Sequence, residues 1–148
     1  MEASANSVLR LVDAVGAAAE RFAQVEDQLL FDTGLSSARM RVAMVLEMAG
    51  APRTVPQVAR SLGLSRQAVQ RLADDLAARG HVAWIENPDH RRARLFELTE
   101  AGRAAYGQAL QRRTLWAQGI SEGLTPAWLA VATELLGLMA RRSELKTK

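Results

Sequence analysis

The sequence predicts a mainly α-helical fold with a small β-hairpin, and three features of the residue pattern support this fold class. Hydrophobic residues recur at three- and four-residue steps over both ends of the chain, as they do on one face of an α-helix. In the middle, two short helical segments are separated by a turn at Gly63. Between residues 81 and 98 the hydrophobic pattern changes to that of two short strands joined by a turn.

The composition is that of a folded protein, and we expect residues 1–148 to form a single domain. Of the 148 residues, 49% are hydrophobic and 24% are charged. The apolar run Leu135–Ala140 is far too short to cross a bilayer, so we expect no membrane association. The beginning of the chain lacks the basic and then apolar layout of a secretory signal, which favours a cytoplasmic protein.

Residue types that carry catalysis or bind metals are sparse. The chain has no cysteine, which excludes disulfides and thiolate metal sites, and its two histidines, His81 and His90, are isolated from each other. The sequence contains no nucleophile elbow, phosphate loop or metal-binding signature. We therefore expect neither enzyme activity nor a metal or other cofactor. His81 instead follows a predicted helix end, where a positive charge suits the helix dipole.

The first two predicted helices are bounded by glycines. Hydrophobic residues at helical spacing over residues 8–30 predict a long amphipathic helix, and Gly34 can adopt the left-handed conformation that ends it. Ser36 or Ser37 then caps a second helix, which stops near Gly50–Pro52.

A third, short helix is predicted over Val55–Leu62. Thr54 stands at its N-cap and Gln57 follows three residues later, which is the spacing of a capping box. Gly63 supplies a turn, and Ser65 caps a fourth helix that extends to about residue 79. The order of these elements is that of a helix-turn-helix.

Three residues distinguish this segment from an ordinary helical hairpin. Ala59 is small enough to let the two helices approach closely, and Gly63 tolerates a positive φ in the turn. Val69 supplies an apolar side chain that faces back from the second helix. The pattern favours the helix-turn-helix interpretation, although a plain hairpin with a glycine turn would share part of it.

Burial of Val69, Leu72 and Leu76 leaves a polar face on the helix that begins after Ser65. An arginine can bind guanine and a glutamine can bind adenine through paired hydrogen bonds, while a serine at a helix N-terminus suits a phosphate. The residues expected to contact DNA here are Ser65, Arg66, Gln67, Gln70 and Arg71. The alternative is a solvated surface helix that happens to be rich in arginine and glutamine.

The hairpin is the most basic part of the chain. Its strands are predicted over His81–Glu86 and Ala93–Leu98, and Arg91, Arg92 and Arg94 lie at or beside its tip. Residues 53–94 carry eight arginines against four acids, a balance of +4, whereas residues 1–52 carry four against seven, a balance of −3. Arginines at a loop tip suit the negative potential of a DNA minor groove, so we expect these three to contact DNA as well.

Two further helices follow the hairpin, the first capped by Thr99 and the second opened by Thr125 and Pro126. Together with the first helix they carry more apolar surface than a small lobe can bury, so we expect both chain ends to form a homodimer interface. On this interpretation the DNA-binding lobe covers about residues 36–99, and the dimerisation helices cover about residues 6–31 and 100–145.

From Ser36 to Tyr106 the chain resembles the MarR family of winged helix-turn-helix regulators. The resemblance is carried by the stretches at residues 58–65, 69–72, 76–80, 87–95 and 98–103. It implies an obligate dimer, a recognition helix over Ser65–Arg79, and Arg92 as the wing arginine in a minor groove. The chain departs from the family in one place, because His90 stands where the family wing usually has an aspartate, and Asp89 lies one residue earlier.

The resemblance also implies an effector site, because many members respond to small aromatic or phenolic ligands. The side chains that could line such a pocket are Phe22, Met40, Met44, Met48 and Trp116, although methionine and aromatic residues at helical spacing are more often plain core. We thus expect a sequence-specific DNA-binding transcription regulator with repression as its direction of action. It would bind a palindromic operator in double-stranded DNA as a homodimer, and a small ligand could release it. A winged-helix module used for protein–protein contact without DNA stays open as the alternative.

Overall fold

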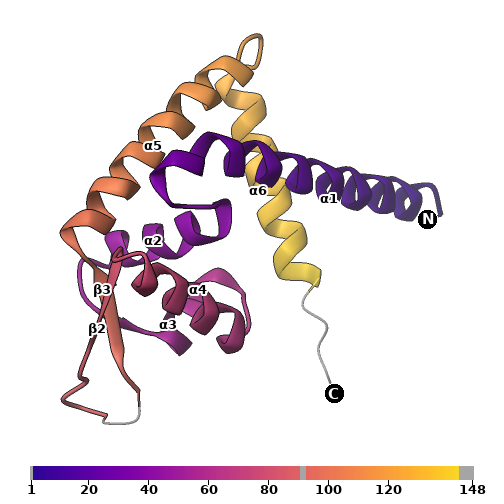
Figure 1. The fold of residues 1–148 in the computed structure, drawn as a ribbon. Helices are drawn as coiled ribbons and strands as arrows, with labels where there is room; N and C mark the ends of the chain where they lie inside the picture. The colour runs from indigo at the N-terminus through magenta and orange to yellow at the C-terminus, as the bar shows by residue number, and fades with distance from the viewer. Residues whose placement is uncertain (1, 91–92, 144–148) are drawn as a thin grey trace, which may run out of the picture. The chain divides into compact units, whose positions relative to one another are not determined.

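The computed structural model describes residues 2–90 and 93–143, and it is mainly helical with a small antiparallel sheet (Figure 1). This confirms the predicted fold class. In chain order the elements are α1 (Glu2–Leu30), the 3-10 helix η1 (Phe31–Thr33), α2 (Ser37–Ala49), β1 (Arg53–Thr54), α3 (Val55–Leu62), α4 (Arg66–Ala78), β2 (Val82–Ile85), β3 (Leu95–Leu98), α5 (Glu100–Ile120) and α6 (Pro126–Ser143). None of the described helices is both long and apolar enough to span a membrane.

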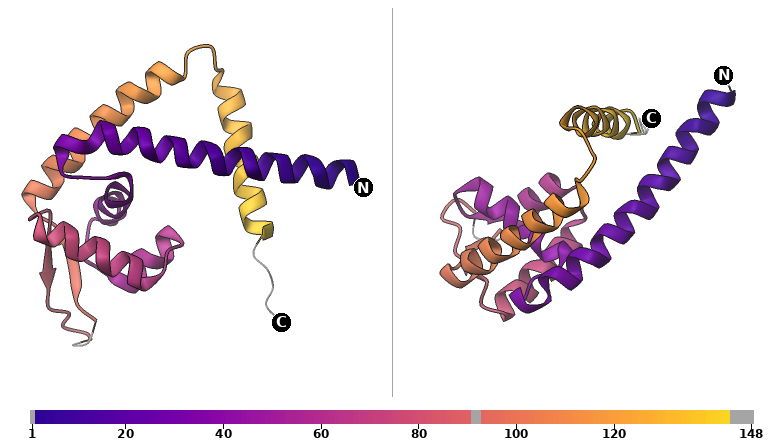
Figure 2. Two further views of the ribbon diagram at one scale, coloured as in Figure 1. Left: turned by 45° about the vertical axis from the view of Figure 1, so that its right-hand side comes forward. Right: turned by 90° about the horizontal axis from the view of Figure 1, so that it is seen from above.

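The chain forms two compact units, and α5 belongs to both. The first unit covers residues 1–113 and contains the sheet together with α1 to α4 and most of α5. The second covers residues 114–148 and contains the end of α5, a turn and α6. In the first unit the hairpin of β2 and β3 extends from one end of the lobe, beside α4 (Figure 2).

The helix ends are fixed by the residues that the sequence singles out. The capping box of α3 is present, because the Thr54 side chain accepts a hydrogen bond from the Gln57 backbone and the Gln57 side chain accepts one from the Thr54 backbone. Gly63 ends α3 with a φ of 64°, and the Ser65 hydroxyl caps α4 by accepting a hydrogen bond from the Ala68 backbone. Local capping chemistry therefore builds the helix-turn-helix.

The sheet contains a strand that the sequence does not predict. The strand order is β1-β3-β2, with Arg53 opposite Phe96 and Thr54 opposite Leu95. Strand β1 has two residues, which is too short for a period of two to appear in the hydrophobic pattern. Thr54 is both the last residue of β1 and the N-cap of α3, so the sheet edge leads directly into the helix-turn-helix.

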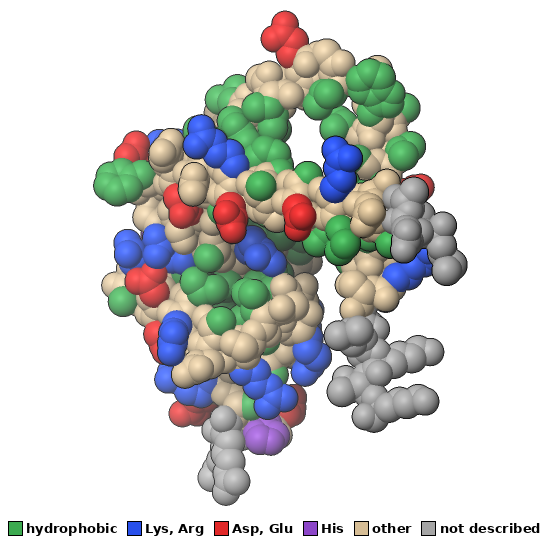
Figure 3. Space-filling view, turned by 90° about the vertical axis from the view of Figure 1, so that its right-hand side faces the viewer, with side chains coloured by type: hydrophobic (Ala, Val, Ile, Leu, Met, Phe, Trp, Pro, Cys, Tyr) green, Lys and Arg blue, Asp and Glu red, His purple; other side chains and the backbone are tan. Residues whose placement is uncertain are grey.

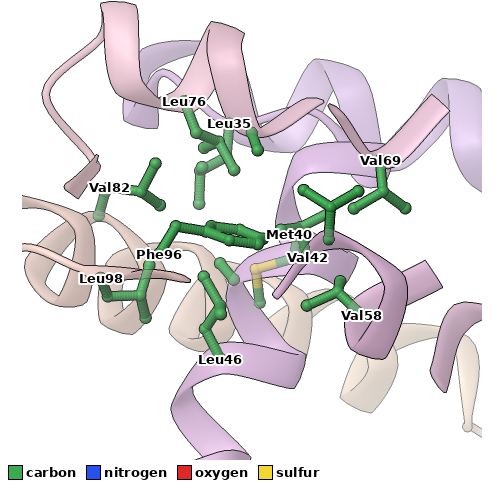
Figure 4. Close-up of a cluster of buried hydrophobic side chains, with 14 of the residues drawn as sticks. Leu35, Met40, Val42, Leu46, Val58, Val69, Leu76, Val82, Phe96 and Leu98 are labelled. Atoms are coloured by element: carbon green, nitrogen blue, oxygen red, sulfur yellow. The ribbon is translucent and has the colours of Figure 1, made fainter. Parts of the chain in front are cut away.

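The core of the lobe is formed by α2, α3, α4 and the sheet together with the end of α1 and part of α5, and Phe96 lies in the middle of the cluster (Figure 4). Phe96, Val69 and Leu76 are each 0% exposed, and Leu72 of α4 is partly buried against the same cluster, so the apolar side of α4 packs on the core. Met40 lies in the same core at 1% exposed. Because this packing fixes the rotation of α4 about its own axis, it also determines which residues of α4 face outward.

His81 connects several elements of the lobe. Its backbone carbonyl accepts a hydrogen bond from the Thr99 amide, and Gly102 of α5 packs so closely on the same carbonyl that a Cβ at position 102 would overlap it. A Cβ at Gly34 would lie 2.8 Å from Cε1 of the His81 ring. The start of the hairpin is thus held between the beginning of α5 and the turn before α2.

Candidate nucleic-acid interface

Helix α4 presents the predicted polar residues on one exposed face. Burial of Val69, Ala73 and Leu76 orients the helix, so that its polar side chains lie at the surface. The exposed residues are Ser65, Arg66, Gln67, Gln70 and Arg71. The structure thus brings together the five residues that were predicted to contact DNA from this helix.

The face also contains the acidic residue Asp74, which was not among the predicted DNA contacts. The Gln70 side-chain amide donates a hydrogen bond of 3.0 Å to the carboxylate of Asp74, one helical turn later. This bond uses one hydrogen of the Gln70 amide nitrogen, and it leaves the Gln70 carbonyl oxygen and the second amide hydrogen available. Asp74 therefore fixes the direction in which Gln70 presents its donor and acceptor.

A groove of about 470 Å³ lies along α4. One side consists of α4 and the other consists of the hairpin, with the start of α3 contributing as well. The lining residues are Val55, Pro56, Arg66, Gln67, Gln70, Asp74, Trp84, Ala93 and Arg94. Arg94, which the sequence places near the hairpin tip, thus shares a groove with the polar face of α4.

Arg94 is supported by a stack of aromatic rings. Its guanidinium carbon lies 5.2 Å from the centroid of the Trp84 ring, which is the geometry of a cation–π contact. The Trp84 ring in turn lies 5.1 Å from the ring of Phe96, its register partner on the neighbouring strand. Sequence reasoning missed Trp84. Its signal was present, because a large aromatic residue alternates with Val82 on the strand that leads into the arginine-rich loop.

The hairpin loop is organised by Asn87. Its side-chain amide donates a hydrogen bond of 2.9 Å to the Ala93 carbonyl, and its side-chain oxygen accepts one of 3.1 Å from the Asp89 amide. Asn87 therefore closes the base of the loop and starts its turn. Arg91 and Arg92 were predicted to contact DNA, and they lie outside the described residues.

An ion-pair cluster ties α4 to α2 behind the polar face. Arg39 of α2 donates a hydrogen bond of 2.6 Å to Asp75, which also accepts one of 3.3 Å from Arg79. Partial burial by itself would raise the pKa of Asp75, but the hydrogen bonds from the two arginines outweigh it, and the pKa is lowered. Asp75 thus stays ionised to a lower pH than an ordinary aspartate and pairs with both arginines.

The same arginines affect His81. Burial lowers the pKa of His81, and the positive charges of Arg79 and Arg39 lower it further. The Nδ1 atom of His81 is buried and has no hydrogen-bond partner among the described atoms. The structure therefore disfavours the charged form of His81 that was expected at the end of α4, because the ring is partly buried beside other cations.

The surface around the groove is rich in basic residues. Figure 3 shows Lys and Arg side chains in blue at the lower end of the lobe, with acidic side chains in red among them. Residues 53–94 carry eight arginines against four acids, so the segment that builds the helix-turn-helix and the hairpin has a balance of +4. A surface of this kind is suited to a polyanion. Within the described ranges no group of three or more histidine, aspartate or glutamate side chains is placed to hold a metal ion.

The residues predicted for an effector pocket lie in different environments. Met40 is packed in the core, whereas Met44 and Met48 line a shallow hollow between α2 and α3, with Met48 80% exposed. Phe22 lies on α1 and is 49% exposed, and Trp116 belongs to the second unit. The structure therefore groups two of the five residues and does not show a common cavity for all of them.

The family model that matches this chain is that of the MarR family, and it covers residues 33–93. Among curated proteins, uncharacterized proteins of Mycobacterium tuberculosis and Mycobacterium bovis are 40% identical to the chain over 86 residues, which is 58% of this chain. The chain spans 60% of the length of these relatives.

Three solved structures illustrate the likeness of fold. A MarR family transcription regulator has a TM-score of 0.82 at 18% identity, and the match covers 95% of this chain and 93% of that one. A mutant MarR from Escherichia coli, complexed with operator DNA, has a TM-score of 0.81 at 23% identity, covering 90% and 96%. The transcriptional repressor CouR, bound to a 23-mer DNA duplex, has a TM-score of 0.78 at 24% identity, covering 86% and 89%.

Proposed function

We propose that this chain is a winged helix-turn-helix transcription regulator of the MarR family, whose family model matches residues 33–93, and that it binds double-stranded DNA sequence-specifically. The observation that carries the proposal is the exposed polar face of α4, which continues across one groove to Arg94 on the hairpin. The DNA-bound proteins of similar fold support the proposal. The similarity to a family of transcription regulators is consistent with the expectation that the chain is not an enzyme.

In the proposed complex α4 enters the major groove. Arg66 and Arg71 can bind guanine through O6 and N7, and Gln67 and Gln70 can bind adenine through N6 and N7. Ser65 and the free backbone amides at the start of α4 would bind a phosphate. The hairpin would follow the DNA backbone, with Arg91 and Arg92 reaching the adjacent minor groove.

The second part of the proposal is a homodimer. Helix α6 has no buried residue among those described, although it is among the more apolar helices of the chain. Large hydrophobic side chains are exposed on α1 at Val8, Leu9, Val12 and Val15, and on α6 at Trp128, Leu129, Val131, Leu135, Leu136 and Leu138. Apolar surface of this extent is normally covered by a partner, and a second copy of the chain offers the same surfaces.

A two-fold dimer would present two α4 helices to one face of the duplex. Half-sites about 34–36 Å apart, or roughly one turn of DNA, match such a pair, so the operator is expected to be palindromic. Repression is the direction that follows when a dimer covers DNA near a promoter. A DNA-binding role also agrees with the expected cytoplasmic location.

The third part of the proposal is that a small aromatic or phenolic ligand releases the protein from DNA. Of the five residues predicted to line the pocket, Met44 and Met48 share one hollow. In a dimer, the second copy of the chain would supply further residues around this hollow. An effector that altered DNA affinity would need a coupling of about 1–3 kcal/mol between its site and the DNA-binding face.

The experiment that tests this function is a duplex-binding titration by fluorescence anisotropy. Duplexes that tile the DNA upstream of the protein's own gene are titrated at low and moderate salt. We expect at least one duplex to bind tightly, with log K falling by about 0.9 per log unit of salt for each phosphate neutralised. Arg66→Ala should weaken that binding more than Arg103→Ala, which removes an equal charge from α5 outside the groove. Absence of binding to every duplex at low salt would favour the protein-contact alternative.

A further inference from the structure

The structure contains a continuous stack from the core to the surface of the hairpin. Phe96 is 0% exposed at the centre of the core, the Trp84 ring packs on it at 5.1 Å, and the Arg94 guanidinium lies over Trp84 at 5.2 Å. Trp84 and Phe96 face each other across the β2–β3 pair, so the register of the hairpin sets their contact. Arg94 is thus the outermost member of a stack that begins in the core.

The stack limits where Arg94 can be. A long arginine side chain on a hairpin ordinarily samples many rotamers, and ordering it on binding reduces affinity. Here the face of the indole attracts the guanidinium, and the indole is itself held by a core residue. Among the described acidic residues none forms an ion pair with Arg94, although Glu86 lines a second hollow together with it.

The held position faces α4. Arg94 lines the same groove as Arg66, Gln67 and Gln70, so positive charge stands on both sides of it. The groove also contains the Asp74 carboxylate, which is hydrogen-bonded to Gln70 and lies on the α4 side. A chain of phosphates that runs between α4 and the hairpin would therefore meet Arg94 opposite the helix.

We propose that Trp84 is a positioning residue for DNA binding, which holds Arg94 beside α4 as a contact to a backbone phosphate. Arg94 then works together with α4 at the major groove. This role differs from the minor-groove contact that is proposed for Arg91 and Arg92. This inference rests on the proposed DNA-binding function, and it adds the assignment of Trp84 and of the phosphate contact. Because phosphates carry no sequence information, the pair contributes to affinity for all duplexes alike.

A double-mutant cycle tests this inference. Arg94→Ala should lower duplex affinity roughly five- to tenfold at moderate salt and reduce the salt slope by about 0.9, the value for one phosphate. Trp84→Leu should lower affinity about two- to fivefold, the strength of an exposed cation–π contact, and Trp84→Phe should restore part of the loss because it keeps an aromatic face. In the Arg94→Ala background, Trp84→Leu should have no further effect, because Trp84 acts only through Arg94.

Several outcomes would overturn the inference. If the losses of Trp84→Leu and Arg94→Ala multiply in the double variant, then Trp84 acts on the whole hairpin, and the positioning role is wrong. Wild-type affinity of Trp84→Leu, or an unchanged salt slope in Arg94→Ala, would reject it as well. Thermal melting of each variant shows whether the hairpin lobe is folded, and Arg103→Ala controls for charge loss alone. If the wild type binds no duplex, the proposed function fails together with this inference, whereas multiplying losses in a protein that binds DNA overturn the inference alone.

Discussion

Arg39 on α2 lies 2.6 Å from Asp75 on α4, and this ion pair crosses the back of the helix that carries the proposed DNA-reading face. Asp75 also contacts Arg79 one turn later on α4, at 3.3 Å. The Arg39 side chain is 20% exposed and the Asp75 side chain is 41% exposed, so water screens the pair only in part. The pair therefore helps to hold α4 at a fixed position on α2.

Replacement of Asp75 should weaken this attachment without removing the DNA-contacting residues. We expect Asp75→Asn to lower the free energy of unfolding by about 1 kcal/mol, because two ion pairs are lost at a partly exposed site. The pKa of Asp75 is lowered, so its contribution is fully present above the unfolded value of 3.8 and disappears as pH falls through the folded pKa. Urea unfolding of both proteins at pH 7 and near pH 3 measures this. A stability difference that stays constant over that range would contradict it.

His81 should make the stability of the lobe dependent on pH in a higher range. Burial and two nearby arginines lower its pKa from 6.5, so the unfolded chain binds a proton at a higher pH than the folded chain does. The stabilisation is therefore complete above pH 6.5 and is lost as pH falls toward the folded pKa. We expect the melting temperature to decrease between pH 7.5 and 5.5 in the wild type, and to decrease less in His81→Gln. Parallel curves for the two proteins would show that another group is responsible.

Two glycines of α5 provide a matched test of the contact between α5 and His81. A Cβ at Gly102 would overlap the His81 carbonyl oxygen, whereas a Cβ at Gly107 would meet nothing within 4 Å. Gly102→Ala should therefore destabilise the protein by about 1–3 kcal/mol or more through overpacking against backbone. Gly107→Ala should stabilise it by up to about 1 kcal/mol, because alanine is the better helix former. Denaturant unfolding of both variants gives the two values, and effects of the same sign would contradict the packing described here.

The hydrogen bond between Gln70 and Asp74 should matter for sequence choice more than for affinity. Asp74→Ala removes a negative charge from the groove and frees the Gln70 amide to rotate. We expect this variant to bind DNA at least as tightly as the wild type, and to discriminate less well between the operator and duplexes with single base changes. Gln70→Ala should relax discrimination at the same base pair by about 1–3 kcal/mol. Titrations of both variants against a panel of single-substitution duplexes test this. Loss of discrimination at different base pairs in the two variants would show that Asp74 does not act through Gln70.

Much of the fold could be predicted because it is specified by local chemistry. Caps at Thr54 and Ser65 and the turn at Gly63 are short-range features, and they define the helix-turn-helix without knowledge of the rest of the chain. The polar face of α4 followed from the burial of its other side. These are properties of residues close together in sequence, which a single sequence displays directly.

The features that were missed depend on contacts between distant segments. The cation–π contact of Arg94 with Trp84 depends on the conformation of the hairpin, and the packing of Trp84 on Phe96 depends on strand register. The methionines of α2 show a second limit. Residues four apart on a helix differ by about 40° in direction, so Met40 is buried while Met48, eight residues later, is 80% exposed. Spacing alone could not place these methionines around one cavity.

The central claim is that a dimer of this chain reads DNA through two copies of α4, and footprinting on the DNA upstream of its own gene tests it most directly. We expect protection of two half-sites with inverted sequence symmetry, whose centres are about 10–10.5 base pairs apart or a multiple of this spacing. Arg66→Ala should weaken the protection of both half-sites equally, because each half-site is read by the same face of α4. Absence of protection at low salt, or protection of a single site without symmetry, would contradict the account.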